Sequence, residues 1–202
     1  MKNLLLCGSL LVFGSGSLFA QVNKVPMIEH FTQASCGPCA SQNPTMQATL
    51  NGYNGEYVKV SHQVSWPGTD PMYNDFQAGP DARVTYYGVQ GVPNTSLNGG
   101  ATGAPNTIVT AATLASAAAV TTPYQITATQ SWADPNTVTV NIDVENVTGS
   151  AVSSADKIYV TMVENQVNYN TAPGSNGETE FFNVMRQMYN ASTGAADATT
   201  GA

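Results

Sequence analysis

The stretch Phe31-Thr32-Gln33-Ala34-Ser35-Cys36-Gly37-Pro38-Cys39 decides the fold of this 202-residue chain. Its first two residues, Phe31 and Thr32, end an apolar run, residues 24–32 (KVPMIEHFT), that predicts a strand lying inside a sheet. A helix is expected over residues 38–50, because Pro38 suits a first turn, where its missing N–H costs nothing. A cysteine just before a helix meets unpaired backbone N–H groups and the positive end of the helix dipole, and both favour the thiolate. The stretch therefore predicts a reactive cysteine, Cys36, at a strand-to-helix turn.

Cys39 lies close enough along the first helical turn to form a bond with Cys36. Such a short loop constrains the unfolded chain very little, so reactivity explains the pair better than stability does. Cys36 would attack a disulfide of a partner, and Cys39 would then resolve the mixed disulfide. Two alternatives stay open: a purely structural pair, and half of a zinc site, for which His30 and His62 are the remaining soft ligands in the sequence.

Residues 1–20 are expected to be a signal peptide. Lys2 gives a positive start, residues 4–13 form a short apolar run, and small residues lead to a cut after Ala20. Cys7 would be lost with this leader; lipidation of Cys7 is the alternative. The sequence thus predicts an exported protein, located in the periplasm or at the cell surface, that keeps two cysteines.

The composition is acidic and poor in charge. The formal net charge is -7 and only 9% of the residues are charged, against about 25% in an average soluble domain. A nucleic-acid partner is excluded because phosphate recognition needs a basic stripe. Anionic lipid is equally unsupported, because the sequence has no polybasic segment.

Residues 21–120 are expected to form one α/β unit. The predicted elements after the first helix alternate between strands and helices, an order that matches a compact α/β domain. They are a strand at 57–64, a polar insertion with one helical turn at 66–80, a helix at 81–87, a strand at 94–97 with a turn at 98–100, and an Ala-rich helix at 106–119 capped by Asn106. The helix at 38–50 should bend at Pro44.

Residues 121–190 change in character and predict a β-rich, Ig-like segment. Residues 124–132 and 137–145 alternate apolar and polar residues, which is typical of half-buried antiparallel strands. A third strand is expected at 157–164, with Phe181 and Phe182 packed beneath, but three strands rarely close a sandwich. Residues 191–202 are small and polar, and we expect the chain to be a piece of a longer protein.

Two landmarks together resemble the thioredoxin superfamily: FTQASCGPC between a strand and a helix, and Gly91-Val92-Pro93 before the strand at 94–97. The resemblance implies a cis Pro93 opposite a Cys36–Cys39 disulfide, and a Val92 backbone that hydrogen-bonds a bound peptide. It also implies a protein thiol–disulfide oxidoreductase that needs no metal or organic cofactor. Its partners would be protein thiols and disulfides, with a redox partner that resets the pair. The Gly-Pro pair is the one found in reducing thioredoxins.

A narrower resemblance concerns Gly174–Arg186 (GSNGETEFFNVMR). This stretch is similar to one in outer-membrane-protein-related, thioredoxin-like secreted proteins of Gram-negative bacteria. The resemblance implies association with the outer membrane or the cell surface.

Three residues near the motif depart from the superfamily pattern. Ser35 stands where thioredoxins have a tryptophan, and His30 stands where they bury a proton-shuttling aspartate, with Glu29 beside it. Both His30 and Glu29 are candidates for general-base work; the alternatives are a hydrogen-bonded strand histidine and a salt-linked glutamate. The missing tryptophan favours a second hypothesis, a non-enzymatic surface binding module with an inert disulfide.

Two other polar residues receive structural predictions. His62, at the end of the second strand, is expected at the surface or in a capping role rather than at the rim of the active site. Arg83 is expected to pair with Asp81 or Glu56.

Overall fold

The computed structural model describes residues 21–148 and 156–190. Within these residues the chain divides into a main unit, residues 23–122 with 156–190, and a hairpin unit, residue 22 with 123–148. The predicted signal peptide, Cys7 and the polar tail at 191–202 lie outside the described residues.

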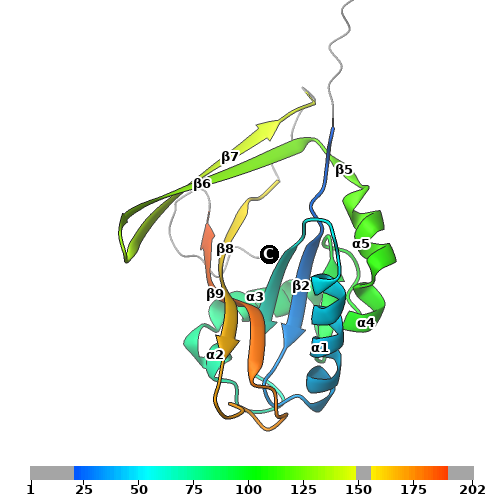
Figure 1. The fold of residues 1–202 in the computed structure, drawn as a ribbon, viewed down its shortest axis with the longest axis vertical. Coiled ribbons are helices and arrows are strands. Elements are labelled where there is room, and N and C mark those ends of the chain that lie inside the picture. Colours follow the sequence, from blue (N-terminus) through cyan, green and yellow to red (C-terminus); the bar gives the residue numbers. More distant parts are fainter. Residues whose placement is uncertain (1–20, 149–155, 191–202) are drawn as a thin grey trace, which may run out of the picture. The chain divides into compact units, whose positions relative to one another are not determined.

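The main unit is built on a mixed five-stranded sheet with the order β4-β2-β3-β9-β8 (Figure 1). The strands are β2 (Met27–Thr32), β3 (Val58–Gln63), β4 (Asn94–Leu97), β8 (Tyr159–Asn168) and β9 (Glu180–Asn190). β2 runs parallel to β3 and antiparallel to β4, while β3 runs parallel to β9. The predicted α/β class is confirmed, with the Cys-x-x-Cys motif at the start of a helix.

Five helices of the main unit connect these strands. They are α1 (Gly37–Asn51), α2 (Pro71–Asp75), α3 (Ala78–Tyr87), α4 (Pro105–Ile108) and α5 (Ala111–Ala118). The Ala-rich stretch is two helices rather than one, because Val109 adopts an extended conformation between them. Thr110, not Asn106, caps the second helix: its hydroxyl accepts from the Thr113 N–H in a reciprocal capping box.

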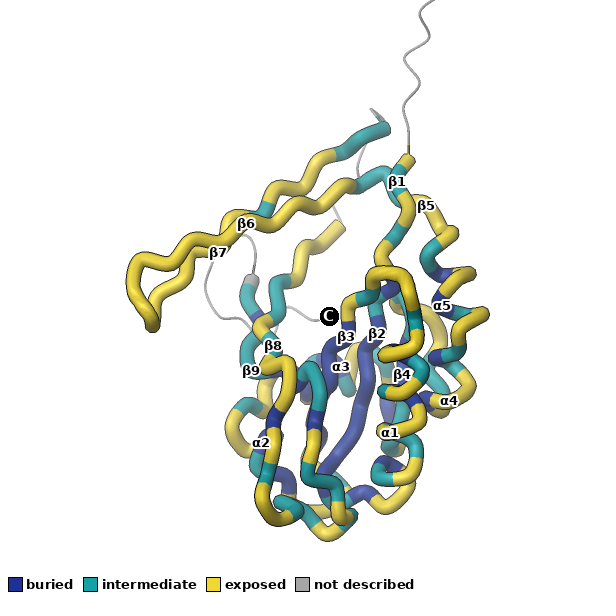
Figure 2. The backbone as a smooth tube through the Cα atoms, viewed as in Figure 1, coloured by how far each residue is buried: buried dark blue, intermediate teal, exposed yellow. Residues whose placement is uncertain are grey.

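The two faces of β2 bury different side chains, since neighbouring residues of a strand point in opposite directions. Ile28 packs with Met46 and Leu50 of α1. Phe31 lies on the other face, in a cluster that includes Val84 and Tyr87 of α3. β2 is therefore buried almost throughout (Figure 2), and a residue's parity along β2 decides which helix it meets.

The last two strands do not form a module with the preceding β-segment. β8 and β9 pair with each other and β9 lies beside β3, so the predicted Ig-like segment at 121–190 is shared between two units. β9 is apolar on both faces: Val184 and Met185 are neighbours in sequence and both are buried. A strand of that pattern fits the inside of a sheet covered on both sides. Phe181 accordingly packs against the main unit, with Ala34 and Met72.

The hairpin unit consists of β6 (Tyr124–Asp134) paired antiparallel with β7 (Thr137–Asn146). Its residues are mostly exposed, coloured yellow in Figure 2. The two antiparallel strands predicted at 124–132 and 137–145 are present, but the prediction that they are half-buried is wrong, because both faces of the hairpin are mostly exposed. Two further short strands, β1 (Val22–Asn23) and β5 (Thr121–Thr122), form a two-stranded sheet.

Candidate active site

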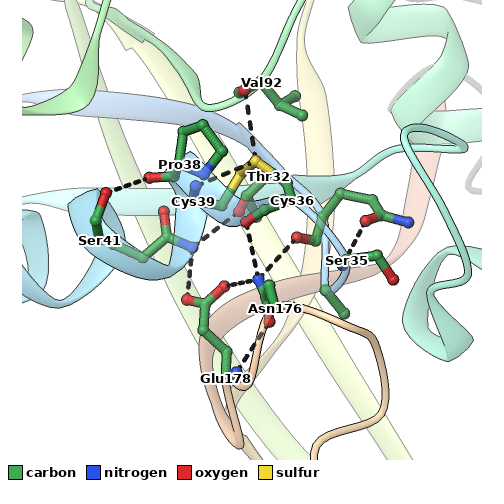
Figure 3. The surroundings of a disulfide bond; sticks show 12 residues. Thr32, Ser35, Cys36, Pro38, Cys39, Ser41, Val92, Asn176 and Glu178 are labelled. Atoms are coloured by element: carbon green, nitrogen blue, oxygen red, sulfur yellow. Dashed lines mark hydrogen bonds between the residues drawn. A yellow bond between two sulfur atoms is a disulfide. The ribbon is translucent and has the colours of Figure 1, made fainter.

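Cys36 and Cys39 form a disulfide at the start of α1 (Figure 3), with Cα atoms 5.2 Å apart. Cys36 is the N-cap residue of α1, and its Sγ accepts a hydrogen bond from the Cys39 backbone N–H at 3.1 Å. Pro38 occupies the first turn, as predicted, and that turn carries no acidic side chain. The helix N-terminus therefore points its N–H groups at the sulfur of Cys36, an arrangement that stabilises a thiolate once the bond is reduced.

The Val92–Pro93 peptide bond is cis, as the resemblance implies. The carbonyl oxygen of Val92 lies 3.5 Å from Cys36 Sγ (Figure 3). This proximity follows from the sheet: Asn94, the first residue of β4, pairs with Phe31 in β2. The antiparallel pairing thus places the turn before β4 beside the turn after β2.

His30 is buried on the face of β2 that α1 covers, and both of its ring nitrogens are hydrogen-bonded. Its Nε2 lies 2.9 Å from Asn43 Oδ1, and its Nδ1 lies 2.9 Å from Thr95 Oγ1. The Asn43 amide nitrogen donates to Thr32, so its oxygen faces His30, and Nε2 is the donor. Burial, with the nearby charge of Lys59, lowers the pKa of His30 to about 3. His30 is therefore a neutral, hydrogen-bonded strand histidine.

Glu29 lies on the opposite face of β2, away from α1. Its two carboxylate oxygens accept from Arg83 Nε and Nη2, each at 2.8 Å, and the Tyr87 hydroxyl also donates to Glu29. Burial raises the pKa of Glu29, but the contacts with His62, Arg83 and Tyr87 outweigh it and bring the value to about 2. The structure thus ties Glu29 to Arg83 and does not bring it together with the cysteine pair.

Two sequence predictions around this pair are wrong. Arg83 binds Glu29 rather than Asp81 or Glu56, because α3 packs directly on the face of β2 that carries Glu29. His62 is buried, not at the surface, and its ring stacks on Phe31 with centroids 4.8 Å apart. His62 Nε2 lies 3.3 Å from Glu29 Oε1, without the alignment of a hydrogen bond.

The segment just before α2 holds one side of the redox turn. We use the term redox turn for residues 33–36. The Asp70 carboxylate accepts from the Ala34 backbone N–H at 2.8 Å and also caps α2 through the N–H groups of Met72 and Tyr73. The Ser35 hydroxyl donates to the Thr69 carbonyl at 2.8 Å. The Asp-Pro dipeptide at residues 70–71 is a helix-start signal, but it carries no information about the contact with Ala34.

The loop between β8 and β9 holds the other side of the redox turn. The Asn176 side-chain amide donates to the Cys36 carbonyl at 3.1 Å and to the Gln33 carbonyl at 3.3 Å, and its backbone N–H donates to the Ala34 carbonyl. The Ser175 backbone N–H donates to the Ser35 hydroxyl at 3.1 Å. These contacts help leave Cys36 only 2% exposed in the oxidised protein.

Gly174 brings the β8–β9 loop against the redox turn, and its replacement by alanine should separate the two. A Cβ at residue 174 would lie 2.2 Å from the Ala34 carbonyl oxygen, a backbone atom that cannot rotate away. We expect Gly174→Ala to lower the free energy of unfolding by about 1–3 kcal/mol, the usual cost of overpacking. Urea unfolding of the oxidised protein measures this loss.

Gly91→Ala is the matched control for this substitution. A Cβ at residue 91 meets nothing within 4 Å, so the control should unfold like the wild type. Equal stability of the Gly174 and Gly91 variants would show that the loop does not press on the redox turn in solution.

Metal binding by the cysteine pair finds no support in the side chains nearby. Among the residues that the structure describes, no three His, Cys, Asp or Glu side chains are grouped so as to hold a metal ion. The zinc alternative would also need His30, whose two ring nitrogens already have partners.

The parallel β2–β3 pair, the helix headed by the Cys-x-x-Cys disulfide and the cis proline before β4 define a thioredoxin-like fold. Among solved structures, the chain is similar to HBP35 of Porphyromonas gingivalis, with a TM-score of 0.59 and 17% sequence identity. The match covers 87% of this chain and 60% of HBP35, so the chain spans less than two thirds of that protein. At this identity the likeness concerns the fold alone.

Neither protein-family models nor curated proteins match the sequence. Within residues 21–148 and 156–190, no helix is both long and apolar enough to cross a membrane.

Proposed function

We propose that this chain is an exported thiol–disulfide oxidoreductase that acts on protein substrates through Cys36 and Cys39. One observation carries the proposal: Cys36 Sγ caps α1, 3.1 Å from the Cys39 N–H and 3.5 Å from the Val92 carbonyl. The first contact stabilises a thiolate, and the second places an edge of backbone beside the reacting sulfur. A purely structural disulfide would need neither.

The reaction runs from the reduced pair. The Cys36 thiolate attacks one sulfur of a protein disulfide; the partner's sulfur–sulfur bond breaks, and its other sulfur leaves as a thiolate that takes up a proton. Cys39 then loses its proton and attacks Cys36 Sγ, which releases the second partner thiol. The partner gains two electrons, Cys36 and Cys39 return to the disulfide, and an external dithiol must reduce them again.

The remaining predicted site residues take different parts in this proposal. Val92 and Pro93 form the turn against which an extended substrate chain would lie. His30 lies on the face of the sheet that α1 covers. As a neutral group, it holds Asn43 of that helix through a hydrogen bond. Glu29 lies on the opposite face of the sheet, where its pair with Arg83 contributes to the stability of the fold.

The proposal of export rests on residues 1–20. A leader with a positive start and a short apolar run directs a chain out of the cytoplasm.

Reduction of insulin by dithiothreitol, with and without the protein, tests the proposed activity. The wild type should accelerate precipitation of the insulin B chain, and Cys36→Ser should remove nearly all of the acceleration, because serine offers no thiolate. Cys36→Ser keeps the size of the side chain, so its folded state can be compared directly by circular dichroism.

A second candidate is a binding module with an inert disulfide. The 2% exposure of Cys36 and the serine at residue 35 favour it, since both limit docking of a partner at the sulfur. Equal, negligible acceleration by wild type and Cys36→Ser would favour this candidate and reject the enzyme.

A further inference from the structure

Glu178, in the loop before β9, lies where three parts of the main unit meet. Its Oε1 accepts from the side-chain amide of Asn43 in α1 at 2.8 Å. Its Oε2 accepts from the side-chain amide of Asn176 at 2.5 Å, and its backbone N–H donates to Asn176 Oδ1 at 2.9 Å. The carboxylate is thus held by two amides that reach in different directions.

Each of the two amides continues to the redox motif. Asn176 donates to the carbonyls of Gln33 and Cys36, at the turn that carries the nucleophile. Asn43 lies one helical turn beyond Cys39 and bonds His30 and Thr32 in β2. Figure 3 shows Glu178 joined by dashed lines to Asn176, which in turn reaches the turn that carries Cys36. The carboxylate of Glu178 is therefore linked through Asn176 to the backbone of Cys36 and through Asn43 to α1 and β2.

Charged and titratable groups from several elements face Glu178. Lys59 comes from β3, Asp70 from the segment before α2, Glu180 from β9, and the neutral His30 from β2. Burial, and to a smaller extent the charge of Asp70, raise the pKa of Glu178 above its usual value, and the two amide donors and Lys59 offset only part of that shift. The two amide donors and Lys59 all favour the negatively charged form of the carboxylate.

A cavity of about 610 Å³ opens beside these groups. Its lining includes Glu178, Lys59 and Asn43. Gln63 lines it as well, and among the described residues its buried side-chain amide finds no hydrogen-bond partner. Glu178 itself is half-buried, so its charge is less screened by water than that of a fully exposed carboxylate.

We propose that Glu178 is a positioning residue of the redox site, through which the β8–β9 hairpin holds the redox turn and opposes negative charge on Cys36. This inference deepens the proposed function, because it concerns the same cysteine pair. A carboxylate near the head of α1 counteracts the helix N-terminus and makes the thiolate less stable. Destabilising the reduced, ionised pair favours the disulfide and makes the dithiol a stronger reductant.

Glu178→Gln separates the charge of this residue from its shape. Glutamine keeps an oxygen acceptor and nearly the same volume but removes the negative charge. We expect the pKa of Cys36, measured by the pH dependence of iodoacetamide alkylation, to fall by about half a unit or more. In glutathione buffers the disulfide–dithiol equilibrium should move about threefold towards the dithiol, which is about 15 mV for a two-electron couple.

Glu180→Gln is the matched control. Glu180 is two residues further along the chain and lines the same cavity, but it is exposed and no hydrogen bond ties it to the redox turn in the described part of the chain. Its replacement should leave both the alkylation profile and the glutathione equilibrium unchanged. Glu178→Ala removes the hydrogen bonds to Asn43 and Asn176 as well as the charge. Its difference from Glu178→Gln in the two measurements shows what these hydrogen bonds contribute.

Two outcomes would overturn the inference. One is an alkylation profile and equilibrium of Glu178→Gln equal to those of the wild type. The other is a rise in the pKa of Cys36, which would mean that glutamate only supports the turn. The glutathione measurement is made at equilibrium, and the alkylation measurement follows a single thiol. Neither needs catalytic turnover, so both stay informative even if the protein fails to reduce insulin.

Discussion

Replacing Cys39 by serine is expected to turn the protein from a catalyst into a trap. Cys36 would still attack a disulfide of the substrate, but no second thiol would release the mixed disulfide. In the wild type Cys39 is the sulfur that bonds Cys36, so its replacement removes the intramolecular thiol that would break the mixed disulfide. Nearly all turnover should be lost, and a covalent complex with an oxidised substrate protein should accumulate on a non-reducing gel.

The double variant Cys36→Ser/Cys39→Ser is the control for trapping. It should form no covalent complex, because both sulfurs of the pair are gone. A Cys39→Ser protein that turns over like the wild type, or one that traps nothing after full reduction, would contradict the assignment of Cys36 as nucleophile and Cys39 as resolving residue.

Breaking the Arg83–Glu29 pair should cause the largest loss of stability among the polar residues discussed. Both side chains are about one-tenth exposed, and the guanidinium contacts both oxygens of the carboxylate. Arg83→Met keeps the apolar stem but leaves a buried carboxylate without its partner. Removing one member of a buried pair costs about 3–5 kcal/mol, which urea unfolding of the oxidised protein at pH 7 would measure.

The pH dependence of this loss follows from Glu29. Its pKa is lowered from 4.5 to about 2 in the folded protein, so its contribution is present above pH 4.5 and is lost as the pH falls towards 2. At 1.36 kcal/mol per unit this contribution is about 3 kcal/mol. The difference between wild type and Arg83→Met should therefore shrink as the pH is lowered from 7 to 3.

Arg186→Met is the matched control for the buried pair. Arg186 also binds two carboxylates, Asp75 and Glu164, but these are 65% and 47% exposed. Exposed ion pairs are worth about 0–1 kcal/mol, so this variant should lose little stability. Equal losses in the two variants would mean that burial adds nothing to the Arg83–Glu29 pair.

Local order in the sequence was sufficient to predict the redox motif and its flanking elements. The apolar run before Phe31 predicts β2, the Gly-Pro start predicts α1, and both lie where expected. The parity of β2 carries further information: Glu29 and His30 are neighbours in a strand, so they cannot both face α1. Strand alternation alone excludes one of the two general-base candidates.

The positions of β8 and β9 in the sheet do not follow from the sequence pattern, because strand propensity carries no information about which strand will be the partner. Residues 157–164 predict a strand from composition alone, and the same residues could pair with β7 or with β9. The observed pairing depends on burial of both faces of β9, where Phe181 and Val184 join a cluster with Ala34 of the redox turn. That contact couples positions about 150 residues apart, which no local pattern records.

The sequence by itself therefore determined the strand, the Cys-x-x-Cys turn and the helix at the start of the chain, because each depends on neighbouring residues, and the resemblance to thioredoxins added the cis Pro93. Only the tertiary structure decided what surrounds the sulfurs. Asn176 lies 140 residues from the cysteine whose carbonyl it binds. Glu178 reaches the same site from the loop that carries Asn176, and Asp70 reaches it from the segment before α2. Hydrogen bonds across such distances arise from sheet order and loop packing, and these follow from burial of the whole core rather than from any one stretch of residues.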